Sequence, residues 1–227
     1  MRCLRYTRGA AGRVSALAAA SGRVSALAAA AAWALALPGC ASAYRHLRPA
    51  LGDPTCIQHF KPALGTAIYK TSVDIIGKHL DGLLVLKAMP DSSTRVVFTS
   101  EAGPTFFDFG FARDGHFTVY HIIDQMNKKA VIKGLRKDFE LILLEHTARG
   151  TCLTDGTQRY YAFPQEKGVN YYITDSACTR LDRVEKASKR SAFVIARLLD
   201  YRDGIPDSIS IRHTKFEFTI AFKRLRN

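Results

Sequence analysis

The sequence lacks the short motifs that identify common classes of hydrolase and kinase. It has no G-x-S-x-G nucleophile elbow, and none of its seven histidines belongs to an H-E-x-x-H zinc motif. The tripeptide Asp108-Phe109-Gly110 matches the magnesium-binding motif of protein kinases, but no glycine-rich loop or catalytic-loop signature accompanies it. The sequence therefore gives no positive sign of an enzyme, a metal site or a cofactor.

The first 39 residues lack acidic residues and lack an apolar run long enough to span a bilayer. This segment carries five arginines, no Asp or Glu, and an apolar stretch from Val24 to Leu37 of about 14 residues. A helix that spans a bilayer needs about 20 residues, which disfavours a retained transmembrane anchor. The layout is that of a cleaved secretion signal, which we assign to residues 1–39.

The end of this segment, Leu37-Pro38-Gly39-Cys40, resembles the lipobox of bacterial lipoprotein signals. The resemblance implies cleavage between Gly39 and Cys40, with acyl chains such as palmitate joined to the new terminus through the Cys40 thiol. A thiolate is the nucleophile that such chemistry needs. Ala41 replaces the Asp that retains enteric-type lipoproteins at the inner membrane, which implies an outer-membrane protein that faces the periplasm.

The rest of the chain remains basic, because the net charge of +13 falls only to +8 without the five arginines of residues 1–39. The basic residues are scattered along the chain, which favours an ordinary solvated surface over a nucleic-acid partner. Residues 40–52 show no hydrophobic period and predict a lipidated terminus followed by a tether. Residues 53–227 predict a single β-rich domain.

Short runs of β-branched and aromatic residues, separated by turn residues, predict ten or eleven strands. These runs are Leu64–Ile76, Lys78–Met89, Thr94–Ser100, Thr105–Ala112, Phe117–Ile122, Arg159–Pro164, Val169–Thr174, Cys178–Lys186, Ala192–Tyr201, Ser208–His213 and Lys215–Leu225. The spacing indicates an antiparallel meander. A sheet of that length tends to curl, so the predicted fold class is mainly β (α+β), an incomplete β-barrel.

One helix is predicted midway along the chain, over Asn127–Leu144, where apolar residues follow a helical period. Asn127 is its expected N-cap, and the opposite face is charged. The apolar face needs a partner, which the sheet supplies. If the curled sheet is open at one end, phenylalanines of one strand and apolar residues of this helix line a cavity instead of a filled core. The expected lining residues are Phe107, Phe109, Phe111, Val131, Leu135 and Phe139.

A lipidated cysteine, a curled antiparallel sheet and a helix inserted midway together resemble the bacterial lipoprotein-localisation family of carriers and receptors (LolA and LolB). The resemblance implies a half-barrel whose cavity holds acyl chains, and hence a non-enzymatic protein that binds a lipid or a lipoprotein. The segments Thr94–Phe98 and Asp108–Phe111 also resemble uncharacterised envelope lipoproteins of Bacteroidetes-type bacteria. Two alternatives stay open: an envelope assembly component that binds a protein partner, and an envelope hydrolase.

Three cysteines follow Cys40 in the sequence, namely Cys56, Cys152 and Cys178. An odd number allows at most one internal disulfide, which the periplasm would permit. Cys152 and Cys178 lie on either side of a predicted hairpin and could form a bridge that ties it down. Buried free thiols are the equally open alternative.

Overall fold

The computed structural model describes residues 42–145, 147 and 149–226, which form one compact unit with its own core. The predicted signal, the cleavage point after Gly39 and the lipidation of Cys40 lie outside the described residues. Within them, no helix is long and apolar enough to cross a membrane.

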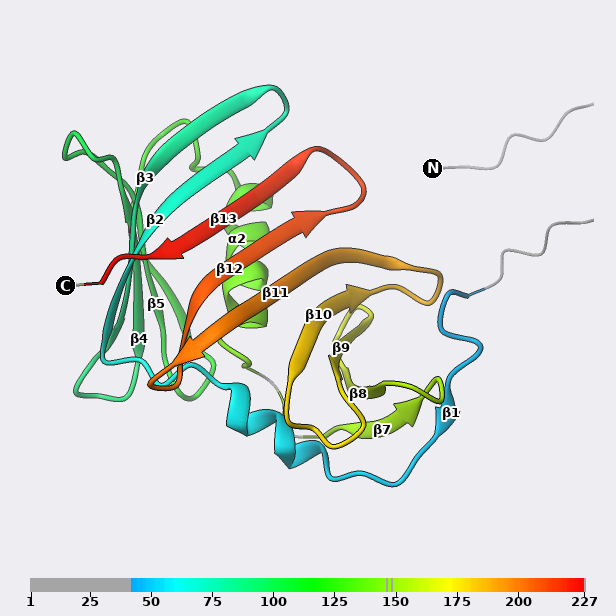
Figure 1. Ribbon diagram of the computed structural model, residues 1–227. Coiled ribbons are helices and arrows are strands. Elements are labelled where there is room, and N and C mark those ends of the chain that lie inside the picture. The colour runs from blue at the N-terminus through cyan, green and yellow to red at the C-terminus, as the bar shows by residue number, and fades with distance from the viewer. Residues whose placement is uncertain (1–41, 146, 148, 227) are drawn as a thin grey trace, which may run out of the picture. The chain divides into compact units, whose positions relative to one another are not determined.

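The unit is built on one antiparallel sheet of thirteen strands that curls without closing (Figure 1). The order across the sheet is β1-β7-β8-β9-β10-β11-β12-β13-β2-β3-β4-β5-β6. The strands are β1 (Arg48–Pro49), β2 (Thr66–Ile75), β3 (Lys78–Ala88), β4 (Thr94–Thr99), β5 (Thr105–Phe111), β6 (Phe117–Ile122), β7 (Thr151–Thr154), β8 (Arg159–Pro164), β9 (Val169–Thr174), β10 (Leu181–Ala187), β11 (Ala192–Arg202), β12 (Ile205–His213) and β13 (Phe218–Arg224). The predicted fold class is confirmed.

Most neighbouring strands are joined by short turns, and two pairings are exceptions. β13 pairs with β2, so that Phe222 lies opposite Thr71, and β1 pairs with β7. The pairing of β13 with β2 joins the meander of β2 to β6 to the meander of β7 to β13, and the pairing of β1 with β7 adds one short strand at the edge of the sheet. The result is a continuous half-barrel.

The α-helix of the described residues, α2 (Lys129–Ile142), lies in the hollow of the sheet (Figure 1). Its side chains Leu135, Phe139 and Ile142 are buried against the strands. The helix is confirmed, but the expected Asn127 cap is wrong. The capping residue is Lys128, whose side chain makes no capping hydrogen bond.

Alternating side chains of β2 to β5 build the core on the concave face of the sheet. Tyr69, Leu84, Phe98 and Phe109 point inward and are almost fully buried, while the residues between them are more exposed. This period of two is the pattern of strands with one face covered. A short 3₁₀ helix, η2 (Pro54–Phe60), is capped by Asp53, whose side chain accepts a hydrogen bond from the Thr55 backbone amide at 2.9 Å.

β8 and β9 are buried on both faces, because residues 42–50 cover their outer face. We call this segment the N-terminal strap. Tyr44 stacks on Tyr171 with ring centroids 4.4 Å apart, and the Ala43 amide donates to the Arg190 carbonyl oxygen at 2.8 Å. The Ala50 amide donates to the Cys152 carbonyl oxygen at 3.0 Å. The expectation of a free tether is thus corrected: the strap is part of the folded unit.

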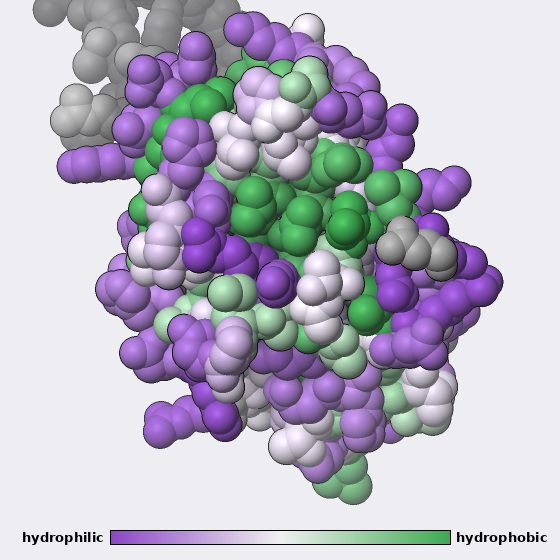
Figure 2. Space-filling model, turned by 90° about the vertical axis from the view of Figure 1, so that its left-hand side faces the viewer, coloured by the Kyte–Doolittle hydropathy of each residue, from purple (hydrophilic) through white to green (hydrophobic). Residues whose placement is uncertain are grey.

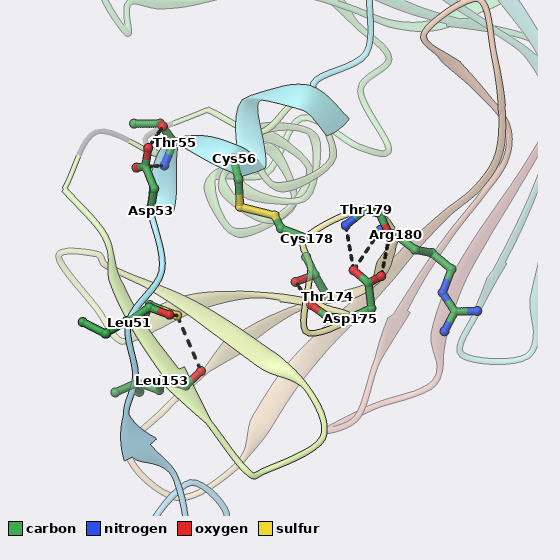
Figure 3. The surroundings of a disulfide bond; sticks show 11 residues. Leu51, Asp53, Thr55, Cys56, Leu153, Thr174, Asp175, Cys178, Thr179 and Arg180 are labelled. Carbon is green, nitrogen blue, oxygen red and sulfur yellow. Dashed lines mark hydrogen bonds between the residues drawn. A yellow bond between two sulfur atoms is a disulfide. The ribbon is translucent and has the colours of Figure 1, made fainter.

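The disulfide joins Cys56 of η2 to Cys178 in the turn between β9 and β10 (Figure 3). The expected Cys152–Cys178 bridge is therefore wrong, and Cys152 is a buried free thiol. Spacing suggested the wrong partner because the fold brings Cys56 to that turn from 122 residues away. In the same turn, Asp175 accepts hydrogen bonds from Thr179, which lower the pKa of its carboxyl group.

Candidate functional site: an apolar cavity under the helix

A cavity of about 440 Å³ lies between α2 and the concave face of the sheet. Aliphatic and aromatic side chains from α2 and from β2, β3, β4, β5, β12 and β13 line most of it. The lining residues are Thr71, Val73, Ile75, Lys78, Leu80, Leu84, Phe98, Phe107, Gln125, Met126, Ala130, Val131, Gly134, Leu135, Phe139, His213, Phe216, Phe218, Ile220 and Phe222. Its size and its apolar lining are those of a small-molecule site.

Two columns of helix residues face the cavity. Val131, Leu135 and Phe139 form one column at a spacing of four, which stacks side chains on one helix face. Ala130 and Gly134 form the other, and a Cβ atom added at Gly134 would meet no heavy atom within 4 Å. Because Ala130 and Gly134 have little or no side chain, the second column leaves open space beside the larger side chains of the first column.

Four of the six predicted lining residues border the cavity: Phe107, Val131, Leu135 and Phe139. The other two, Phe109 and Phe111, do not, and that part of the prediction is wrong. Both pack instead against Phe117, with ring centroids 5.2 Å away in each case.

The four correct residues were predicted from local patterns, namely the alternation of β5 and the helical period of α2. The lining residues of β2, β3, β4, β12 and β13 were missed. The last two strands reach the cavity through the pairing of β13 with β2. The Ala130–Gly134 spacing was a local signal that could have indicated open space beside the helix.

A buried polar pair sits at one side of the cavity. Asp138 lies on α2 four residues after Gly134 and is 1% exposed. His213 Nε2 lies 2.8 Å from its carboxylate. The imidazole ring of His213 stands close to Phe216 and Phe218, at centroid distances of 4.9 and 4.8 Å. Removing either partner would leave the other buried and unpaired, which is costly in a protein interior. The pair therefore holds α2 against β12.

The cavity opens at one end of the half-barrel. Lys78, Gln125 and Ala130 are exposed there, and Phe216 is half exposed. The turns β2–β3, β12–β13, β10–β11 and β8–β9 all lie at this end, because adjacent strands of the meander alternate in direction (Figure 1). We call this end the rim.

The outer face of the sheet carries an apolar row. Ile68 of β2 pairs with Val85 of β3, and Val85 pairs with Val97 of β4. All three point away from the core and are partly exposed or exposed. Figure 2 views the molecule from the left of Figure 1, and it shows a continuous apolar area on that side.

Two titratable side chains, Lys78 and His213, are among the lining residues of the cavity, and His213 is paired with Asp138. No three or more His, Cys, Asp or Glu side chains in the described ranges 42–145, 147 and 149–226 are placed to hold a metal ion. Burial lowers the pKa of Lys186, which lies near Asp138. Burial likewise raises the pKa of the Cys152 thiol, away from the cavity.

No protein-family model matches the sequence, and a search of curated proteins found no relative. Solved structures with a similar fold include a LolA superfamily protein from Nitrosomonas europaea, at 8% identity and a TM-score of 0.48 over 78% of this chain and 95% of that one. A putative outer membrane lipoprotein-sorting protein domain from Vibrio parahaemolyticus is 6% identical, with a TM-score of 0.46 over 76% and 90%. A DUF1329 family protein from Desulfovibrio piger is 8% identical, with a TM-score of 0.41 over 76% and 88%.

Proposed function

We propose that this protein is a non-enzymatic, lipid-anchored protein of the bacterial envelope that holds an acyl chain in the cavity under α2. The observation that carries the proposal is the cavity itself, which is apolar along its walls and opens at the rim. Apolar walls with a few polar groups at one end suit a ligand that has a hydrocarbon chain and a polar head.

The cavity volume suits one acyl chain. If a methylene group occupies about the 30 Å³ of a water molecule, 440 Å³ holds roughly 15 such groups. Each buried methylene contributes about 0.8 kcal/mol, so burial alone can supply micromolar affinity after the cost of immobilising the ligand. Lys78 at the mouth could pair with a carboxylate or phosphate head group.

The cellular location belongs to the same proposal. We place the domain in the periplasm, on the outer membrane, anchored through acyl chains at Cys40. The lipobox-like segment that ends at Cys40 supports this location, and so does the Cys56–Cys178 disulfide, because such bonds persist in oxidising compartments. Mass spectrometry of the native protein tests the anchor: an unmodified Cys40, or an intact amino-terminal extension, would contradict it.

Ligand binding is tested on a fragment that begins at Ala41, because the described part of the chain forms one compact unit. We expect this fragment to take up a fluorescent fatty acid and to release it when palmitate is added. We also expect mass spectrometry of organic extracts to find a co-purified lipid. A properly folded fragment that neither binds the probe nor carries a lipid would overturn the proposal.

A second function, binding of an envelope protein, is favoured by the apolar row on the outer face. Contiguous exposed apolar surface often marks a protein interface. A photo-crosslinking residue at Val85 would then capture a partner in cells, whereas the same residue at Lys61, on another part of the surface, would not. Equal capture at both positions would count against a specific partner.

A further inference from the structure

The N-terminal strap begins at the rim. The hydrogen bond from Ala43 to Arg190 fastens it to the β10–β11 turn, and Tyr44 donates a hydrogen bond to Glu185 at 2.5 Å. Cys40 precedes the described Ser42 by two residues, and two residues span at most about 7 Å. An anchor at Cys40 would therefore hold the bilayer close to this part of the rim.

A groove of about 630 Å³ lies beside the start of the strap. The basic side chains of Arg45, Lys167 and Lys189 line it and are exposed. The hydroxyl-bearing residues Ser42 and Ser188 also line it. This mixture of cations and hydroxyl groups suits a phosphate, which accepts hydrogen bonds and is negatively charged.

The charge around the groove is strongly unbalanced. Arg190 adds a fourth exposed basic residue at the β10–β11 turn, and Glu166 at the β8–β9 turn is the exposed acid nearby. Four positive charges and one negative charge give +3. The nearby Glu185 adds little free negative charge, because it accepts hydrogen bonds from Tyr44 and from Arg183.

We propose that this groove binds the phosphate head groups of anionic lipids and so turns the rim, with the cavity mouth, toward the membrane. The inference rests on the proposed function, because the anchor at Cys40 supplies the membrane. Three features on one rim support a lipid surface as the occupant: the net positive charge, the nearby start of the anchoring segment, and the half-exposed Phe216 at the β12–β13 turn. Exposed aromatic and basic side chains together suit the bilayer interface.

The experiment measures binding of the fragment that begins at Ala41 to vesicles of phosphatidylglycerol mixed with phosphatidylcholine, and to vesicles of phosphatidylcholine alone. A basic side chain near an anionic surface changes the partition coefficient by about fivefold. Replacing Lys167, Lys189 and Arg190 by Gln should then weaken binding on the order of 100-fold. The matched control is a triple Gln variant with the same net charge, made at three exposed basic residues away from the rim: Lys87, Arg113 and Lys223.

The outcomes separate this inference from the proposed function. We expect the wild-type fragment to prefer the anionic vesicles, the rim variant to lose that preference, and both variants to keep uptake of the fluorescent fatty acid. Equal loss in both variants would mean that net charge alone drives binding, and would overturn the inference. Absence of vesicle binding by the wild type would overturn it as well. Failure of the wild-type fragment to take up the fatty acid would instead contradict the proposed function.

Discussion

Substitution of Gly134 offers the sharpest test of the cavity, because it changes stability and ligand binding in opposite directions. The residue lies inside α2 and faces open space, since an added Cβ atom would meet nothing within 4 Å. We consider Gly134→Leu, with Gly134→Ala as its matched control. Both replacements remove a glycine from a helix interior, which should stabilise the fold by about 0.5 to 1 kcal/mol.

The effect on binding follows from the space that each side chain takes. Leucine adds four carbons to the cavity and displaces about four methylene groups of a bound chain. At about 0.8 kcal/mol each, the loss is about 3 kcal/mol, or on the order of 100-fold in Kd. Alanine adds one carbon and should weaken binding by about fourfold at most.

The assay combines two measurements on each variant. Displacement of a fluorescent fatty acid gives Kd, and urea denaturation gives the free energy of unfolding. A Gly134→Leu variant that is as stable as the wild type but binds the fatty acid equally well would show that the ligand sits elsewhere. A large loss of stability would contradict the open space that the structure places there.

The remaining predictions concern the cysteines and one buried tyrosine. Reduction of the Cys56–Cys178 bond, which closes a loop of 122 residues, should lower the free energy of unfolding by up to about 5 kcal/mol, measured by urea denaturation with and without reductant. Cys152, buried and with its pKa raised by burial, should react with a thiol reagent only after unfolding; fast reaction in the native state would contradict its burial. Burial raises the pKa of Tyr69, which donates to the Pro206 carbonyl at 2.9 Å, to about 12. The folded state then binds more protons than the unfolded state between pH 10 and 12, so stability should fall as pH rises through that range, and should fall less in Tyr69→Phe.

Local sequence signals were sufficient to predict most helices and strands of the fold. The predicted limits of β8 and β9 match those of the structure, and the helical period located α2 to within two residues at each end. The elements that were missed are β1, β7 and η2. β1 and β7 have two and four residues, too few to show a period, and they are strands only because they pair with each other and with β8.

The site was less predictable because it depends on contacts between distant segments. Phe107, Phe109 and Phe111 share one face of β5, so their period alone cannot tell which of them meets the cavity. The position of α2 and the ring of Phe117 decide which phenylalanines meet the cavity, and the sequence of β5 predicts neither. Pairing of β13 with β2 likewise brings a whole wall to the cavity from the end of the chain.

Docking of the N-terminal strap changes how the domain could meet a membrane. A flexible tether of the 12 residues 41–52 would have a root-mean-square length of roughly 20 Å and would let the domain rotate freely. The strap leaves only about 7 Å of chain between Cys40 and the described Ser42. A lipid anchor at Cys40 would then restrain the orientation of the domain as well as its distance from the bilayer. Because the strap begins at the same rim as the cavity mouth, a lipid could pass between bilayer and cavity without crossing open water.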